Sequence, residues 1–482
     1  MWYSNWYEKY EIEIVMKIFS KDKEFYKRTF TIALPIAAQS LISIGVNMLD
    51  TMMLGNLGNS NSSALKAASQ ANSFITIYHI LCMGLGMGAS VLVSRYWGII
   101  KSNGAEKEDA NRSLKQTIAL MLRFTLGLAA LFALVTALFP EFIMGTYSTN
   151  PELIQQGSIY FRWSVATYFF LGVSLVTTIV LRSVGSVKPP LFISIGALSI
   201  NLLANYALIY GHFGAPRMEI AGAALATLIA RICEASAILI YLFIIDKKIH
   251  FKPYHIFIKC GSLIKEYIRI CIPVLISDGI LAFGTNLVAQ IIGHLGDDLV
   301  SANAVTAVTQ QLSTAVVQGV SQAGAIVTGH TLGEGDKEKT MRHGYLFFGL
   351  GIALGIFAAV FITVTKTPII SAYTDLSQNE IEIAHQLMWA ISIIIIFQAT
   401  NSIMTKGVLR GGGDTMMLMV TDNIFLWTIS IPLGCLAGFV FKLPPFWIYI
   451  CLKSDQIIKT IWSLLRLRSG KWIKKVSTSK TN

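Results

Sequence analysis

Twelve long apolar runs limit most strongly what this chain can fold into. Each run is more than 20 residues long, and a helix of about 20 residues crosses roughly 30 Å of hydrocarbon. The runs cover residues 29–54, 64–97, 114–138, 157–181, 190–210, 220–245, 267–295, 302–332, 344–365, 383–409, 416–441 and 444–465. Composition agrees, because 54% of residues are hydrophobic, only 14% are charged and the mean hydropathy is +0.58. The sequence therefore predicts an all-α integral membrane protein with twelve transmembrane helices. The last of them is the weakest, since Lys453, Asp455 and Lys459 interrupt it.

The lysines and arginines predict the orientation, because they gather on the cytoplasmic side of membrane proteins. With the N-terminus in the cytoplasm, 30 of the 39 lie in cytoplasmic segments or at the adjoining helix ends, and 4 lie outside. The reverse orientation inverts this bias. We therefore expect a multi-pass protein of the inner (plasma) membrane with both termini in the cytoplasm. The net charge of +12 then reflects the topology and the lipid bilayer surface, and it does not indicate nucleic acid as a partner.

An internal repeat relates the two halves of the chain. Pairs of matching residues are Pro35 and Pro273, Gly55 and Gly293, and Gly58 and Gly296 at an offset of 238, then Gly84 and Gly319 at 235. Later, LRSVG at 181–185 matches LRGGG at 409–413. Each repeat holds six crossings, an even number, so both halves have the same orientation in the membrane. This indicates two six-helix bundles in a parallel repeat, the arrangement of many transporters that alternate access to a central site.

The repeat predicts five parts of the chain. They are a cytoplasmic N-terminal segment (1–28), an N-lobe of helices one to six (29–245), a cytoplasmic linker (246–266), a C-lobe of helices seven to twelve (267–465) and a basic cytoplasmic tail (466–482).

Polar residues inside the apolar runs of the N-lobe are candidates for a functional site. An ionisable group near the bilayer centre costs about 2.5–3.5 kcal/mol on insertion scales, so it needs a reason to be there. The first run carries Gln39, Ser43, Asn47 and Asp50 at spacings of four, four and three, which places them on one helical face. Asn201 and Asn205, four apart in the fifth run, form a second such stripe. We interpret these residues as a cation or proton site; a structural hydrogen-bond cluster is the alternative.

The C-lobe has its own buried polar residues. Asp278 lies in the seventh run and Asp422 in the eleventh. The eighth run carries Thr306, Gln310, Thr314 and Gln318 at a spacing of four, and the tenth carries Gln398 and Asn401. Such a polar face has to meet water or polar partners because lipid offers none. We therefore expect Asp278 and Asp422 to be coupling candidates and the uncharged residues to line a cavity.

Other features point away from catalysis. Arg231 and Glu234, three apart in the sixth run, are expected to pair with each other. The six cysteines form no CxxC pair, and neither an HExxH nor a GxSxG motif is present. We therefore expect no cofactor, no bound metal apart from a monovalent ion, and no enzymatic activity.

The chain resembles the multidrug and toxic compound extrusion (MATE) transporters, close to their NorM-like bacterial branch. The resemblance covers about residues 25–474. It rests on Pro35, Gln39, Asn47, Asp50-Thr51 and Gly55 in the first run, on the LRSVG and LRGGGDT turns, on NLLANYALIYGHFGAP (201–216) and on GAALATLIARICE (222–234). It implies two six-helix bundles that form a V and antiport of drugs driven by Na⁺ or H⁺. We expect the protein to be a monomer.

The family's functional residues match this sequence unevenly. Asp50 matches the family's acid in helix one, and Asn201 matches its asparagine in helix five. Asn205 stands where one branch has aspartate, and Asp278 stands where the NorM-like branch often has glutamate. Helix ten has no acid near Asn401, although the NorM-like cation site uses one, and our hypothesis is that Asp422 takes its place.

The resulting hypothesis is a multidrug efflux antiporter for amphipathic, often cationic, small molecules, driven by Na⁺ or H⁺. A lipid-linked oligosaccharide flippase of related architecture is one alternative, which favours a basic central cavity. An intramembrane enzyme or a non-transporting receptor is another; the first lacks a catalytic motif and the second has no need of buried acids.

Overall fold

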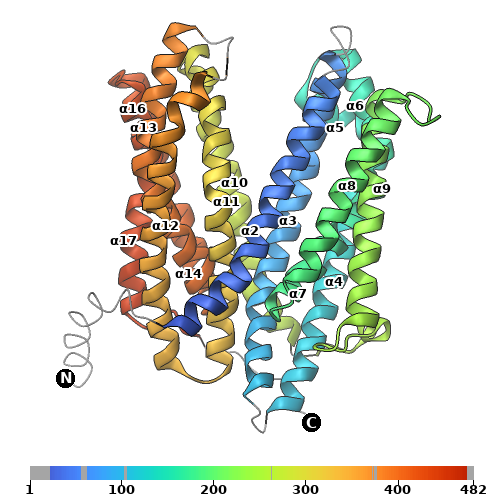
Figure 1. Cartoon of the computed structure of the whole chain (residues 1–482), viewed down its shortest axis with the longest axis vertical. Coiled ribbons are helices and arrows are strands. Elements are labelled where there is room, and N and C mark those ends of the chain that lie inside the picture. The colour runs from blue at the N-terminus through green and yellow to red at the C-terminus, as the bar shows by residue number, and fades with distance from the viewer. Residues whose placement is uncertain are drawn as a thin grey trace. The chain divides into compact units, whose positions relative to one another are not determined.

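The computed structural model describes residues 22–55, 62–102, 106–261, 263–371, 373 and 377–474, apart from the side chains of 47–52, 54–55 and 62–65. These residues form helices joined by turns, with no strand among them (Figure 1). The first half contains α2 (Lys23–Gly55), α3 (Ser62–Lys101), α4 (Lys107–Leu138), α5 (Pro140–Tyr147), α6 (Pro151–Ser164), α7 (Thr167–Ser183), α8 (Lys188–Tyr210), α9 (Glu219–Ile240), η2 (Tyr241–Ile245) and η3 (Pro253–Phe257). The second half contains α10 (Leu263–His294), α11 (Asp297–Gly333), α12 (Lys337–Ser371), α13 (Gln378–Ser402), η4 (Ile403–Leu409), α14 (Thr415–Phe425), η5 (Leu426–Ser430), α15 (Ile431–Cys435), η6 (Leu436–Val440), α16 (Pro445–Leu452) and α17 (Ser454–Arg468).

All twelve predicted spans are helical. Within the described residues nine helices are long and apolar enough to cross a membrane, and a tenth span is the α6–α7 pair, bent by 57°. The other two predicted spans are α11 and the α16–α17 pair. Both carry more polar residues, including the Asp455 and Lys459 that already marked the last run in the sequence. The expected helical membrane fold is confirmed.

Capping residues explain why some helices begin before the apolar runs do. The fourth run starts at residue 157, but α6 begins at Pro151 because the side chain of Asn150 accepts a 3.0 Å hydrogen bond from the backbone N–H of Glu152. Proline suits the first helical position, where its missing N–H is not needed. At the start of α13 the capping is reciprocal. The hydroxyl of Ser377 accepts from the backbone N–H of Glu380, and the carboxylate of Glu380 accepts from the backbone N–H of Ser377. Local capping therefore determines where a helix begins, whereas hydropathy indicates which part of it can lie in the membrane.

The helices group into two compact units. Unit N consists of residues 38–278, and unit C consists of residues 22–37 together with 279–474. The long helices α2 and α10 are therefore each divided between the two units. Their division points, after Ala37 and after Asp278, lie near matching positions of the internal repeat.

Two glycines at matching positions of the repeat make corresponding close contacts. A Cβ on Gly84 would lie 3.1 Å from the Cα of Leu275 within unit N. A Cβ on Gly319 would lie 2.8 Å from the Cβ of Ala37 within unit C. The repeat relates Gly84 to Gly319 and Ala37 to Leu275. In each repeat, the N-terminal half of the first helix thus packs against the second helix of the other repeat. Only a small residue at the contact allows this close approach.

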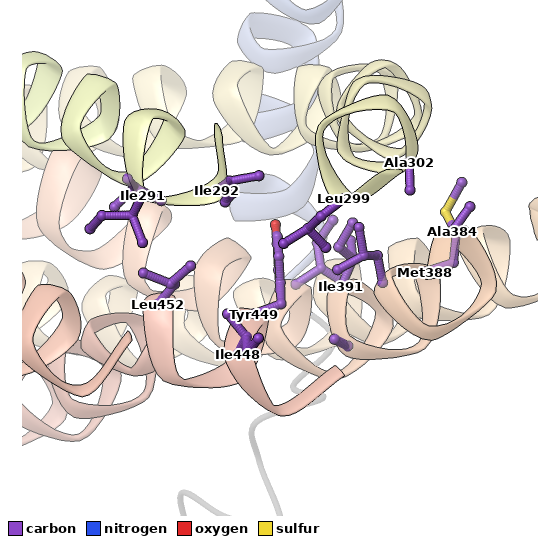
Figure 2. Packing of buried hydrophobic residues seen from close by; sticks show 14 of the residues in the cluster. Ile291, Ile292, Leu299, Ala302, Ala384, Met388, Ile391, Ile448, Tyr449 and Leu452 are labelled. Carbon is purple, nitrogen blue, oxygen red and sulfur yellow. The ribbon is translucent and has the colours of Figure 1, made fainter. Parts of the chain in front are cut away.

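The core of unit C fixes the short helix α16. Tyr449 and Leu452 of α16 belong to a buried cluster with Ile292 of α10, Leu299 of α11 and Ile391 of α13 (Figure 2). The side chain of Tyr449 is 4% exposed and that of Leu452 is 1% exposed. This packing holds the start of α17, which follows directly and carries buried charges.

The linker is bound to unit N. The guanidinium of Arg123 on α4 donates to the backbone carbonyls of Ile256 (2.6 Å) and Ile258 (2.8 Å). The amide of Gln116, also on α4, donates to the carbonyl of Lys259 (2.8 Å). These bonds attach the segment around η3 to the side of α4.

Candidate functional site

The polar stripe of the first helix is held by hydrogen bonds inside unit N. The side chain of Gln39 is buried, and its amide donates to the hydroxyl of Ser194 (2.6 Å) and to the carbonyl of Pro190 (3.2 Å) on α8. Its carbonyl oxygen accepts from a guanidinium nitrogen of Arg182 on α7. The hydroxyl of Ser43 donates to the backbone carbonyl of Gln39 (3.1 Å). This part of the stripe is thus engaged with protein groups.

The other half of that stripe falls outside the described side chains. Asn47 and Asp50 lie on α2, but their side chains are not among those that the structure describes. Their predicted role as part of a cation or proton site remains a prediction.

Charges on α9 extend the cluster around Gln39. Arg231 donates to Glu234 (2.6 Å), which confirms the pair predicted from their spacing. The other carboxylate oxygen of Glu234 accepts from the hydroxyl of Ser194 (3.3 Å). We call Gln39, Arg182, Ser194, Arg231 and Glu234 the unit N polar cluster. It holds two guanidinium groups and one carboxylate.

Arg182 is a residue that reasoning from sequence missed. It stands in the LRSVG motif, which served only to identify the repeat. The signal was available, because an arginine directly after an apolar run is either at the surface or held by buried acceptors. Arg182 is 9% exposed and belongs to the second class.

The asparagine stripe of α8 is a local pair. Asn201 is 5% and Asn205 1% exposed, and the amide of Asn205 donates to the side-chain oxygen of Asn201 (3.3 Å). Asp278 on α10 is partly exposed and is the last residue of unit N.

Unit C contains a chain of neutral polar contacts along the predicted stripe of α11. The amide of Gln310 donates to the side chain of Gln398 on α13 (2.8 Å), and its oxygen accepts from the hydroxyl of Tyr449 (3.2 Å). Thr306 and Thr314 donate to backbone carbonyls of their own helix. Gln318 is exposed on the same helix. Within this stripe, Gln310 therefore meets polar partners on α13 and α16.

Two aspartates and one lysine form a deeply buried group of charges in the described part of unit C. The ammonium of Lys459 on α17 lies 2.9 Å from a carboxylate oxygen of Asp455 and 3.7 Å from one of Asp422 on α14. The exposed fractions of the three side chains are 2%, 2% and 7% in that order. We call these residues the unit C charge triad.

Further polar groups complete the surroundings of Asp455. Its two oxygens accept from the hydroxyl of Ser430 (3.1 Å) and from the amide of Gln456 (2.8 Å). Gln456 in turn accepts from the amide of Asn401 on α13 (2.9 Å). The side-chain oxygen of Asn401 is buried and accepts no hydrogen bond from the described residues. Asn401 and Asp422, both candidates from the sequence, thus belong to one connected network.

Asp455 and Lys459 interrupt the last apolar run of the sequence and make it the weakest of the twelve. Their spacing was the missed signal. Opposite charges four apart on a helix meet on one face, so inside an apolar run they indicate an internal pair.

Within the described residues, no group of three or more His, Cys, Asp or Glu side chains has the geometry of a metal site. The triad can hold a single positive charge between two carboxylates, and in the structure Lys459 supplies that charge.

Comparison with known proteins extends over most of the chain. The MatE family model matches residues 35–207 and 273–436. A protein of Thermotoga maritima named "Probable multidrug resistance protein NorM" is 25% identical over 455 residues, which cover 94% of either chain. "Multidrug resistance protein NorM" of Burkholderia vietnamiensis is 26% identical over 422 residues, covering 84% of this chain and 86% of the relative.

Solved structures show the same fold. One described as "Outward-facing conformation of a multidrug resistance MATE family transporter of the MOP superfamily" superimposes with a TM-score of 0.82 at 15% identity. The match covers 92% of this chain and 96% of that one.

Proposed function

Because this chain belongs to the MatE family, whose model matches more than half of its residues, we propose that it is a multidrug efflux antiporter. It expels amphipathic, often cationic, organic compounds from the cytoplasm in exchange for inward Na⁺ or H⁺. It lies in the inner (plasma) membrane with both termini in the cytoplasm, as the distribution of lysine and arginine predicts.

The observation that carries this proposal is the burial of titratable groups inside helices that cross the membrane. Asp422, Asp455 and Lys459 are each at least nine-tenths buried, although such groups are costly in a membrane. A purely structural bundle gains more from apolar side chains of similar size, since burying an ion pair removes both charges from water. Ion coupling needs charged groups that are shielded from water, as these three are. The names of the relatives, both multidrug resistance proteins, agree with drugs as the substrate class.

Electrostatics supplies the coupling. An ionised carboxylate in a low dielectric takes up a proton or pairs with a cation, so an ion and a cationic drug compete for it. A ligand that binds one conformation better shifts the protein toward that conformation. At 100 mV, one entering positive charge contributes about 2.3 kcal/mol, which corresponds to roughly fifty-fold accumulation of a neutral exported compound. When the exported compound carries one positive charge, a one-for-one exchange moves no net charge, and the concentration gradient of the ion alone drives it.

Four further residues keep proposed roles in this cycle. Asp50, Asn201 and Asn205 form the ion or substrate contacts of the first repeat, and Asp278 forms those of the α10 helix. Their chemical type fits the roles, since carboxylate and amide oxygens are the ligands that hard monovalent cations accept.

Transport by the purified protein in proteoliposomes tests the proposal. A fluorescent lipophilic cation is offered to vesicles in which a pH gradient or a Na⁺ gradient is imposed separately. The proposal predicts accumulation against the concentration gradient with at least one of the two ions, and collapse of accumulation when an ionophore removes that gradient. Equilibration without accumulation under both gradients would contradict it.

A further inference from the structure

The linker of unit N lies beside the membrane-spanning part of α4. Gln116 and Arg123 of α4, which bind the backbone of residues 256–259, both lie within the apolar run that starts at Leu114. The linker also directly follows the span formed by α9 and η2, and it leads into the span formed by α10. It is therefore held at the level where α4 enters the membrane.

Large apolar side chains of the linker are left exposed at this level. Phe257 is 83% exposed and Tyr254 is 65% exposed, and both belong to the short helix η3. Ile244, near the end of η2, is 77% exposed. Aromatic side chains are enriched at the boundary between membrane and water, where the ring meets lipid and the polar groups meet water. The exposure of these side chains thus indicates contact with lipid.

Lysines flank the apolar side chains along the linker. Lys252 stands directly before η3 and Lys259 stands two residues after it. Both are exposed, and neither forms an ion pair within the described residues. From Asp246 to Lys259 the segment holds four lysines and one acid. The carboxylate of that acid accepts from the backbone N–H groups of Lys248 (3.2 Å) and Ile249 (2.7 Å). Most of the lysine charge is therefore left without a counter-charge from the linker itself.

Positive charges from α3 and α4 add to those of the linker. Burial lowers the pKa of His255, and the nearby charges of Lys115 on α4 and of Lys252 lower it further. Partial burial also lowers the pKa of Lys248, where the single acid of the segment opposes the shift and Lys101 of α3 adds to it. The linker thus lies in a region of positive potential, which an anion stabilises.

We propose that Lys248, Lys252, Tyr254, Phe257 and Lys259, which we call the linker surface, bind anionic phospholipids of the cytoplasmic leaflet. The two aromatic rings enter the boundary between headgroups and acyl chains, and the lysine ammonium groups pair with the lipid phosphates. The cytoplasmic leaflet carries a negative surface potential, which attracts basic segments next to a membrane span. Such binding requires the cytoplasmic position proposed for the linker, but it does not require transport.

Photocrosslinking to the purified full chain tests this binding. The protein is placed in nanodiscs of phosphatidylcholine that contain a small fraction of a photoreactive phosphatidylglycerol, and mass spectrometry locates the labelled peptides. At low salt the peptide that covers residues 246–261 should be labelled, and a photoreactive phosphatidylcholine at the same fraction should label it several-fold less. High salt should remove this difference, because screening weakens pairs between exposed charges.

A variant that lacks three lysines of the linker surface should lose the preference for phosphatidylglycerol. This variant is Lys248→Gln/Lys252→Gln/Lys259→Gln. Each lysine near an anionic membrane surface changes the affinity about fivefold at low salt, so labelling by the anionic lipid should fall to the level of phosphatidylcholine. If the variant cannot be recovered folded, the comparison of the two lipids and its salt dependence in the wild type still decide.

The matched control removes three exposed lysines from unit C, in the variant Lys23→Gln/Lys27→Gln/Lys337→Gln. It lowers the net charge by the same amount and should keep the wild-type labelling of the linker. Equal labelling of the wild-type linker by the two lipids at low salt would overturn the proposal, as would an equal loss in the two triple variants.

A soluble anion is the other possible occupant of the linker surface. If inorganic phosphate prevents labelling where sodium chloride of the same ionic strength does not, the surface binds the anion from solution and the proposal fails. Labelling that follows the lipid charge in a protein that transports nothing would contradict the proposed antiport alone.

Discussion

Units N and C both bury charged side chains inside their helices, but they pair these charges with different chemical groups. The offset that relates LRSVG to LRGGG also relates Ser194 to Asp422. Each of these residues then contacts a charge on the last helix of its own repeat. The hydroxyl of Ser194 reaches Glu234 (3.3 Å), and the carboxylate of Asp422 lies 3.7 Å from Lys459. Equivalent places in the repeat thus carry a neutral group facing an acid in unit N and an acid facing a base in unit C.

The buried bases of the two units also differ in kind. The bases of the unit N polar cluster are arginines, which do not lose their proton in proteins. Arg182 and Arg231 can therefore hold neighbouring helices but cannot carry protons. The base of the unit C charge triad is a lysine, a compact charge with three N–H donors. We infer that duplication supplied two similar frames that now bury different charges, two arginines with a glutamate in unit N and a lysine with two aspartates in unit C.

Asp50→Asn should have the largest effect on transport. Removing an ionisable group from a membrane helix lowers the cost of insertion, so expression and folding should persist while coupled efflux falls to the level of cells without the transporter. Drug resistance and ion flux in intact cells measure this. Unchanged transport in Asp50→Asn together with lost transport in Asp422→Asn would confine coupling to unit C.

Lys459→Met should have the largest effect on stability. It removes the ammonium that lies between two buried carboxylates, and breaking a buried pair in this way costs about 3–5 kcal/mol in comparable cases. The matched variant Arg231→Met should cost less, because the side chain of Arg231 is 35% exposed whereas that of Lys459 is 2% exposed. Thermal unfolding of both variants in the same detergent measures the difference. Equal losses would remove the distinction between the two units.

Gln39→Ala should destabilise unit N by an intermediate amount. The change removes the acceptor of Arg182 and the donor to Ser194, and an unsatisfied buried group costs about 1–3 kcal/mol. Ser43→Ala serves as the control, because within the described residues its hydroxyl donates to a carbonyl of its own helix and to no other element. If both variants melt at the same temperature, Gln39 is no structural tie between α2 and the α7–α8 region.

Tyr449→Phe should have the smallest effect. It removes one hydrogen bond to Gln310 and leaves the ring in its buried cluster, and such a neutral bond contributes about 0.5–1.5 kcal/mol. Thermal unfolding again provides the measurement. A loss as large as that of Lys459→Met would mean that the polar chain along α11, and not the triad, organises unit C.

The sequence predicted those features that depend on neighbours along the chain. Hydropathy located all twelve helical spans, and the spacing of Arg231 and Glu234 predicted their pair. The same spacing rule predicts the pair of Asp455 and Lys459. Hydropathy alone hides this pair, because charges inside an apolar run also weaken the run.

Contacts between distant segments lay beyond this reasoning. Nothing in the local pattern relates Lys459 to Asp422, or Arg182 to Gln39, because those distances depend on how several helices pack. The division of α2 and α10 between the units was equally hidden. It follows from crossed packing at Gly84 and Gly319, and a repeat alignment shows matching residues but not which half each one contacts.

The most direct test of the account is transport by the wild type and Asp422→Asn in proteoliposomes under one ion gradient at a time. The account predicts that at least one of the two gradients drives accumulation of a lipophilic cation in the wild type and that Asp422→Asn abolishes this accumulation. Accumulation in Asp422→Asn at the level of the wild type would contradict it.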